Sequence, residues 1–185
     1  MEREKDKREK EIMPQDNITI RNATTEDAAK LLAIYTPYVE HTAITYDIRV
    51  PSLEEFSRQI TDISREYPFL VAEVNGRITG YCYAHRFIQR EASSHCAEMS
   101  IYVEQDNRKT GVGRRLYAEM EDRLRKQGIH NLYAQVTWTD EENEYLTNAS
   151  TAFHMRMGYV KAGHYHECGR KFNRTFDTIV LEKII

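Results

Sequence analysis

The spacing of apolar and polar residues predicts that strands and helices alternate in the first part of this chain. Residues 18–21 alternate between apolar and polar side chains, which indicates a strand. Apolar residues then recur at helical spacing over 28–39, and Pro37 is expected to end or bend that helix. Ser52 and Glu55 have the spacing of a capping box, which predicts a second helix that begins directly after Ser52 and carries Leu53, Phe56, Ile60 and Ile63 on one face.

The second part of the chain is richer in strand patterns. Two β-rich runs, 69–74 and 78–87, flank Asn75-Gly76, the dipeptide that most strongly favours a tight hairpin. Further along, the pattern predicts strands at 96–103 and 131–138, helices from 112 to before Gly128 and at 149–157, and two final strands within 159–185. Helices first, a hairpin in the middle and a β-α-β order afterwards predict an α/β fold, a mixed sheet covered by helices.

Length, composition and charge indicate one ordinary globular domain. The chain has 185 residues, 41% of them hydrophobic and 30% charged. Residues 1–16 are almost all polar or charged, so we expect a mobile or solvated-helix extension before a single domain at 17–185. A net charge of -3 argues against nucleic acid as a partner. No apolar run is long enough to span a membrane, and three widely spaced cysteines favour a reducing, cytoplasmic location.

A glycine-containing loop, Arg108-Lys109-Thr110-Gly111-Val112-Gly113, joins the strand at 96–103 to the next helix. A helix N-terminus offers unpaired N–H groups and a partial positive charge, and glycines let an anion approach the backbone closely. Arg114 and Arg115 add formal charge nearby. The pattern therefore predicts a phosphate site, although an ordinary turn before a helix explains the loop alone about equally well. It is neither a dinucleotide-binding fingerprint nor a Walker loop, because the third glycine and the Gly-Lys-Ser/Thr ending are absent.

This loop resembles the R/Q-x-x-G-x-G/A cofactor loop of the GNAT acetyltransferase superfamily. Other segments resemble the phosphinothricin and methionine sulfone N-acetyltransferase subfamily, in the same order and with similar spacing from about residue 18 to the end. These segments are Gly80-Tyr81-Cys82-Tyr83-Ala84, Arg90, Glu98-x-Ser100-Ile101-Tyr102-Val103, Asn148-Ala149-Ser150, His154, Gly158-Tyr159, Lys171 and Asp177. The resemblance is specific for the fold and the cofactor, and less so for the acceptor.

The resemblance implies a mixed, mostly antiparallel sheet of about seven strands with a splayed central strand, and acetyl-CoA as the cofactor. Main-chain groups of the central strand would pair with the pantetheine arm, the glycine loop would surround the pyrophosphate, and two residues of the later helix would lie on the opposite side. The implied cofactor-binding residues are Ile101, Tyr102, Val103, Arg108, Lys109, Thr110, Gly111, Val112, Gly113, Arg114, Asn148 and Ser150.

Glu98 is the residue that we expect to act as general base. An acceptor amine is largely protonated at neutral pH and must lose a proton before it attacks a thioester. A carboxylate on the strand beside the acetyl group can take that proton directly or through one water molecule. The strand alone favours a carboxylate without a role at a sheet edge, and the resemblance is what makes Glu98 the candidate.

His154 is the second catalytic candidate. Many GNAT enzymes carry a tyrosine at the corresponding helix position, thought to protonate the departing CoA thiolate, and the subfamily that this sequence resembles has a histidine. A histidine packed on a helix face is the competing interpretation.

The acceptor pocket departs from the subfamily pattern. Relatives often carry aromatic residues where this chain has Ser93, His95 and Thr175, so we expect a wider and more polar site. Arg90 and Lys171 are the candidate acceptor-binding residues, because either cation would pair with an anionic group on the acceptor. Solvated surface cations remain the alternative for each of them.

His164, His166 and Cys168 alternate along the predicted strand and would face the same side. The spacing matches no common zinc framework and no fourth ligand is evident, so we expect no metal and interpret these residues as a wall near the acceptor site.

The sequence therefore predicts a cytoplasmic, acetyl-CoA-dependent N-acetyltransferase for a small-molecule amine acceptor, one of phosphinothricin or methionine sulfone type. The resemblance also implies a homodimer. Two alternatives stay open: an enzyme that acetylates a protein or peptide, and a non-catalytic acyl-CoA-binding regulatory protein.

Overall fold

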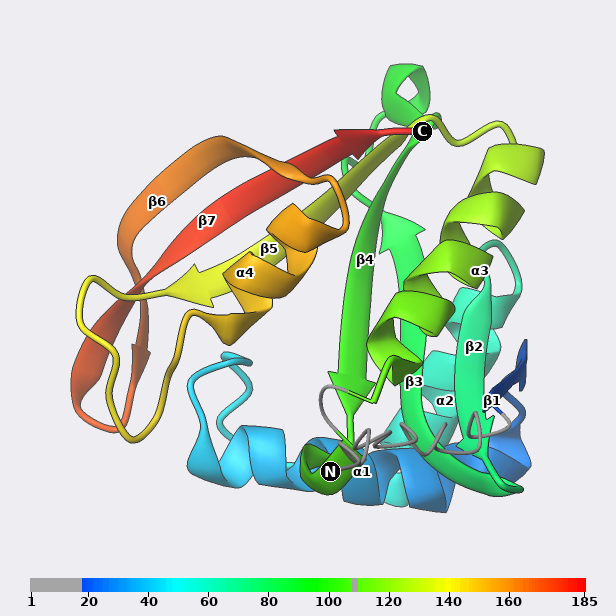
Figure 1. The fold of residues 1–185 in the computed structure, drawn as a ribbon, viewed down its shortest axis with the longest axis horizontal. Helices are drawn as coiled ribbons and strands as arrows, with labels where there is room; N and C mark the ends of the chain where they lie inside the picture. The colour runs from blue at the N-terminus through cyan, green and yellow to red at the C-terminus, as the bar shows by residue number, and fades with distance from the viewer. Residues whose placement is uncertain (1–17, 108–109) are drawn as a thin grey trace, which may run out of the picture.

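The computed structural model describes residues 18–107 and 110–185, in which one sheet separates two helical layers (Figure 1). The strands follow the order β1-β2-β3-β4-β5-β7-β6 across the sheet. They are β1 Ile18–Asn22, β2 Phe69–Val74, β3 Arg77–Arg86, β4 Cys96–Val103, β5 Asn131–Trp138, β6 Val160–Lys171 and β7 Arg174–Ile184. All neighbouring strands are antiparallel except β4 and β5, which are parallel. The predicted mixed, mostly antiparallel sheet is confirmed.

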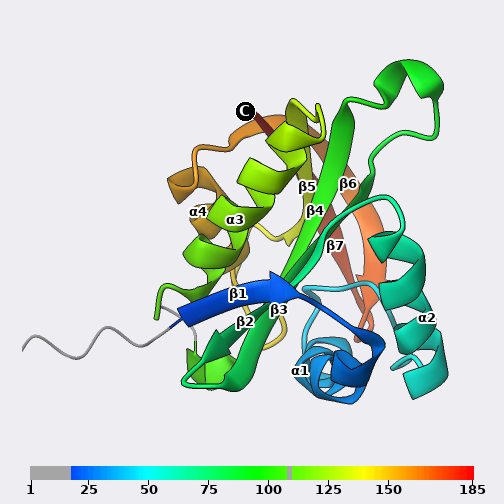
Figure 2. The same cartoon turned by 90° about the vertical axis from the view of Figure 1, so that its right-hand side faces the viewer.

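Four α-helices cover the two faces of this sheet (Figure 2). They are α1 Ala28–His41, α2 Leu53–Ser64, α3 Val112–Lys126 and α4 Ala149–Arg156. One core cluster joins α1 and α2 to one face, and a second joins α3 to the other face, where α4 also lies. Three short 3-10 helices, η1 Thr25–Asp27, η2 Glu91–Ser93 and η3 Gln105–Asn107, complete the described elements. Within the described ranges, no helix combines the length and apolar composition needed to cross a membrane.

The central parallel strands diverge, as the resemblance implied. β4 and β5 pair only from Cys96 with Asn131 to Glu98 with Tyr133. Beyond Glu98, β4 remains paired with β3 and β5 with β7, so the two inner edges have no strand between them (Figure 1). Glu98 therefore marks the point at which the sheet opens.

Pro37 does not end α1, which continues to His41. Proline removes one helical hydrogen bond and usually interrupts a helix. Here Tyr38 and Val39 follow it and are buried in the core beneath the sheet, 5% and 3% exposed. Tertiary packing of the last turn therefore outweighs the local preference: of the two outcomes predicted at Pro37, an end or a bend, the helix does not end there.

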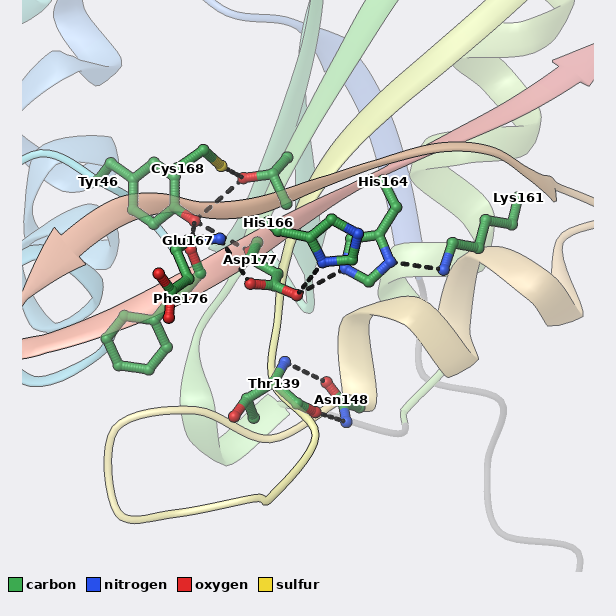
Figure 3. Close-up of polar contacts among 11 residues, drawn as sticks. Tyr46, Thr139, Asn148, Lys161, His164, His166, Glu167, Cys168, Phe176 and Asp177 are labelled. Atoms are coloured by element: carbon green, nitrogen blue, oxygen red, sulfur yellow. Dashed lines mark hydrogen bonds and ion pairs between the residues drawn. The ribbon is translucent and has the colours of Figure 1, made fainter.

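An irregularity interrupts β6 between Tyr165 and Gly169. Glu167 adopts a positive φ of 49° in this bulge, so the simple alternation of side chains is lost. His164 and His166 lie side by side, whereas the Cys168 thiol points away from them and donates to Thr178 (Figure 3). The prediction that Cys168 shares a face with both histidines is wrong, because strand periodicity does not reveal a bulge.

The connection between α1 and α2 docks onto the same bulge. Tyr46 lies directly over Gly169, where a Cβ atom would come within 2.0 Å of the tyrosine ring. Its hydroxyl donates to the main-chain oxygen of Asp177 at 3.0 Å. The buried Lys171 ammonium donates to the Thr45 carbonyl at 3.0 Å. The same connection places Ile44 in the wall of the opening between β4 and β5.

Candidate active site

Side chains of β4 alternate between the two helical layers. Tyr102 packs edge-on against Tyr35 and Tyr38 of α1, with ring centroids 4.8 and 5.2 Å away. Ile101 faces the opposite layer, 3.5 Å from the position that a Cβ atom on Gly113 would take. By strand alternation, Glu98 lies on the α1 side with Tyr102.

Glu98 is partly buried at the point where the sheet opens. Gln135 of β5 reaches across the opening and donates to its Oε2 atom at 3.0 Å. His85 lies directly opposite Glu98 on β3. The carboxylate thus has one fixed amide partner, and its other oxygen is able to accept a proton from a group placed in the opening.

A small cavity of about 50 Å³ occupies the opening between the strands. Its walls are the facing edges of β4 and β5, one residue on the α1 side of the sheet and three residues of α3 and α4. They are Ile44, Met99, Ser100, Ile101, Tyr102, Tyr117, Ala134, Gln135, Val136, Thr137, Ser150 and His154. The cavity therefore connects the α1 face of the sheet with the α3 and α4 face.

His154 and Tyr117 form a buried hydrogen-bonded pair in the wall of this cavity. Nδ1 of His154 lies 2.8 Å from the Ser150 carbonyl oxygen, an acceptor, so Nδ1 carries the proton. Nε2 therefore accepts the hydrogen bond from the Tyr117 hydroxyl, at 2.7 Å. Burial lowers the pKa of His154 to about 4, which keeps the ring neutral at neutral pH. Burial also holds the pKa of Tyr117 well above its ordinary value.

The N-terminus of α3 has the backbone form that an anion site requires. Gly111, the N-cap residue, adopts φ 93°, and among the described residues other than its two chain neighbours no atom lies within 4 Å of the position that its Cβ atom would take. The first turn of α3 contains no acidic residue, so its N–H groups and partial positive charge are not neutralised locally. Thr110 bonds back to the Asn107 carbonyl at 2.7 Å. Arg108 and Lys109, predicted for the same site, lie outside the described residues.

Val103 and Asn148, both predicted to contact the cofactor, form hydrogen bonds with other residues of the protein. The Tyr38 hydroxyl contacts both main-chain groups of Val103. The Asn148 amide donates to the Thr139 carbonyl at 2.9 Å and accepts from the Thr139 N–H at 3.4 Å (Figure 3). Asn148 thus ties the end of β5 to the start of α4, which orients the helix that carries His154.

A larger hollow of about 370 Å³ lies on the α1 face and shares Tyr102 with the cavity between the strands. Aromatic rings and a few polar groups line it: Tyr35, Thr45, Asp47, Pro51, Glu55, Phe56, Gln59, Tyr81, Tyr83 and Tyr102. Glu55 is already paired with Arg49 at 2.9 Å, whereas Asp47 accepts only the Tyr35 hydroxyl among its side-chain contacts in the described part of the chain. An acceptor on this side would meet aromatic walls and reach the same opening that Glu98 borders.

The two predicted acceptor cations do not meet at one place. Lys171 is 6% exposed, with its ammonium held by the Thr45 carbonyl, and burial lowers its pKa. It lines a separate hollow of about 480 Å³ between the end of α1 and the turn from β6 to β7. Arg90 is exposed at the start of η2, outside both hollows.

Comparison with known proteins identifies the family. The profile described as "Acetyltransferase (GNAT) domain" matches residues 20–180. This chain belongs to the GNAT acetyltransferase family. It is 28% identical over 170 residues to the phosphinothricin N-acetyltransferase of Streptomyces coelicolor, covering 90% of this chain and 95% of that protein. It is also 28% identical to the L-methionine sulfoximine/L-methionine sulfone acetyltransferase of Salmonella typhimurium, over 89% of this chain and 93% of that one.

Solved structures agree with this assignment. The phosphinothricin acetyltransferase of Sinorhizobium meliloti, solved in complex with acetyl-CoA, superposes with a TM-score of 0.82. The two sequences are 28% identical over 91% of this chain and 88% of that one. The GNAT fold and the acetyltransferase class are therefore shown, as the sequence predicted.

Sequence reasoning about the GNAT chain missed Tyr117, Gln135 and Asp47. Tyr117 falls among the apolar positions of α3 and looks like a core residue. Gln135 is the polar residue between Ala134 and Val136 on a strand that is otherwise largely apolar, which is the one signal that marked it. Asp47 lies in an irregular loop, where no periodicity indicates which way a side chain points.

The buried His154 should make the stability of this acetyltransferase depend on pH. Its pKa falls from 6.5 in the unfolded chain to about 4 in the folded one, so the unfolded state binds more protons between these values. The contribution of neutral His154 to the free energy of unfolding is complete above pH 6.5. It is lost as the pH falls toward 4, which lowers the free energy of unfolding by about 3 kcal/mol in all. Denaturant unfolding of the wild type and His154→Gln across this range measures the effect. The difference between the two curves should change with pH, and parallel curves would contradict the assigned burial of a neutral histidine.

Proposed function

We propose that this protein is a cytoplasmic enzyme that transfers the acetyl group of acetyl-CoA to the primary amine of a small amino-acid-like acceptor. Glu98 acts as the general base. The observation that carries the proposal is the separation of β4 and β5 immediately after Glu98. It leaves a cavity whose wall contains Gln135, the hydrogen-bond partner of Glu98, and the Tyr117–His154 pair. The named relatives act on amino-acid analogues, which supports this acceptor class.

The residues at the end of α3 and along β4 fit acetyl-CoA. The open space at Gly111 and the unneutralised helix N-terminus suit a pyrophosphate. Thr110, Val112, Gly113 and Arg114 would surround it, together with the loop residues Arg108 and Lys109. The unpaired edge of β4 at Ile101 and Tyr102 would hold the pantetheine arm. When bound, acetyl-CoA would supply a thioester carbonyl that an unprotonated amine attacks.

Glu98 removes the proton that makes the acceptor amine unreactive. Gln135 holds Oε2, which leaves Oε1 to accept this proton directly or through one water molecule. The hollow on the α1 face, lined by Tyr35, Tyr83 and Tyr102, would orient the acceptor toward this oxygen.

Tyr117 would donate a hydrogen bond to the departing thiolate by turning its single hydroxyl proton away from Nε2 of His154. Neutral His154 carries its proton on Nδ1, which is committed to Ser150, so its Nε2 cannot donate. The raised pKa of Tyr117 keeps the hydroxyl protonated, and His154 orients it within the cavity wall. His154 therefore acts as a positioning residue for Tyr117. The proposal keeps the homodimer implied by the resemblance; the outer strand β6 carries the exposed Val160 and Tyr165.

Release of the CoA thiol across a panel of amines tests the acceptor class. The panel contains phosphinothricin, methionine sulfone, methionine sulfoximine, glutamate, a polyamine and short peptides. Turnover is expected with at least one amino-acid analogue at a higher kcat/KM than with any peptide or polyamine. Turnover with peptides alone would contradict the proposal and favour a protein or peptide acetyltransferase. Acetyl-CoA binding without turnover of any amine would favour a non-catalytic acyl-CoA-binding protein.

A further inference from the structure

The bulge in β6 brings three potential metal ligands together outside the proposed active site. The Nε2 atom of His164 lies 2.7 Å from Oδ2 of Asp177, and Nδ1 of His166 lies 3.4 Å from the same oxygen. One ligand atom from each of the three residues lies within 4.8 Å of the other two. Figure 3 shows the two imidazole rings side by side with the Asp177 carboxylate directed at both.

The backbone fixes the carboxylate in this arrangement. Oδ1 of Asp177 accepts a hydrogen bond from the Glu167 N–H at 2.8 Å, which leaves Oδ2 for the histidines. Asp177 is paired with Trp138 across β5 and β7, and His164 packs edge-on against the Trp138 ring, with centroids 5.2 Å apart. Two of the three ligands are therefore held in place by the sheet, and His166, with a side chain 75% exposed, is free to adjust.

We propose that His164, His166 and Asp177 bind a divalent transition-metal ion, Zn²⁺ foremost. Two imidazole nitrogens and one carboxylate oxygen form a donor set that Zn²⁺ prefers, with a fourth position left for water. Tetrahedral Zn²⁺ with bonds of about 2.0–2.1 Å places its ligand atoms about 3.3 Å apart. The present separations bracket that value, so small side-chain rotations complete the site.

Lys161 stabilises the metal-free arrangement of His164 and Asp177. Its ammonium lies 3.0 Å from Nδ1 of His164, so Nδ1 accepts a hydrogen bond from Lys161 while Nε2 donates one to Asp177. A metal on Nε2 shifts the histidine proton to Nδ1, which then opposes the ammonium. Lys161 is exposed and can turn into solvent, but its departure costs affinity. A hydrogen-bond acceptor at position 161 would instead support the metal-bound tautomer, as second-shell acceptors do in zinc sites.

Trp138 reports on the site, because it is the single tryptophan of the chain and contacts His164. The experiment uses full-length, tag-free protein stripped of metal with a chelator and then titrated with Zn²⁺ alone. Trp138 fluorescence and isothermal titration calorimetry are followed together. We expect saturation at one Zn²⁺ per chain at micromolar concentrations with a change in the Trp138 signal. Absence of saturable binding below millimolar Zn²⁺ would overturn the proposal.

Variants identify the ligands. His166→Gln should lower the Zn²⁺ affinity at least about 10-fold, whereas Lys161→Gln should raise it by up to about 10-fold. His41→Gln, at a side chain 71% exposed on α1, is the matched control and should leave the affinity unchanged. Cys168→Ser should also leave it unchanged, because the thiol points toward Thr178.

Two outcomes would refute the ligand set. Unchanged affinity in His166→Gln would place the metal elsewhere. Loss of binding in Cys168→Ser would mean that the Cys168 thiolate, and not Asp177, is the third ligand. The bulge would then have to rearrange, because the thiol now points toward Thr178. None of the three ligands belongs to the proposed transfer site, so the result is independent of which acceptor the enzyme uses.

Discussion

Replacing Glu98 with glutamine is expected to lower kcat/KM by about 10²–10⁴ while acetyl-CoA affinity stays within a few-fold of the wild type. Glutamine has almost the shape of glutamate but cannot accept the amine proton. The opening between β4 and β5 and the backbone at Gly111 should both remain, because the side-chain hydrogen bond of Glu98 goes to Gln135 of β5, and glutamine can keep that partner. Initial rates of CoA thiol release, together with calorimetric binding of acetyl-CoA, separate the chemical step from cofactor binding.

Glu66→Gln provides the control, since Glu66 is exposed beyond the end of α2 and the substitution is identical. Its rate should equal that of the wild type. A Glu98→Gln enzyme that turns over normally would show that the acceptor loses its proton elsewhere.

Much of the fold was predictable because local patterns and tertiary packing agree. The capping box of Ser52 and Glu55 begins α2, the Asn75-Gly76 turn joins β2 to β3, and β4 has the bounds that its alternation predicts. At Pro37 the two disagree, and the buried Tyr38 decides in favour of a continuous helix.

The partners within the site were not predictable, because they join distant parts of the chain. Lys171 was expected to bind the acceptor, but its ammonium is held by Thr45, 126 positions away. His154 was expected to donate a proton, but its tautomer depends on Ser150 and on Tyr117, 37 positions away. A residue type indicates the chemistry that it is capable of, whereas the hydrogen bonds that set its protonation come only from the assembled fold.

Gly111 of the cofactor loop can be replaced by aspartate or by asparagine, two side chains of almost the same size that differ in charge. The comparison isolates the effect of charge on cofactor binding. Asparagine and aspartate tolerate a positive φ better than most residues, and no described residue beyond the chain neighbours comes within 4 Å of a Cβ atom at this position. Both residues are also good helix N-caps, and aspartate is further favoured by the helix dipole. Gly111→Asp should therefore fold at least as stably as Gly111→Asn, so a difference in cofactor binding cannot come from unfolding.

Gly111→Asp is expected to bind acetyl-CoA about 100-fold more weakly than Gly111→Asn. A carboxylate about 5 Å from one charge of the pyrophosphate, at an effective dielectric constant of about 20, costs about 3 kcal/mol. Isothermal titration calorimetry with acetyl-CoA measures both dissociation constants, and the gap between them should narrow as salt is added. Asparagine alone should weaken binding only modestly, by occupying space that the glycine leaves open. Equal affinities in the two variants would mean that the pyrophosphate does not lie at Gly111, and the cofactor would then have to enter the opening between β4 and β5 from another direction.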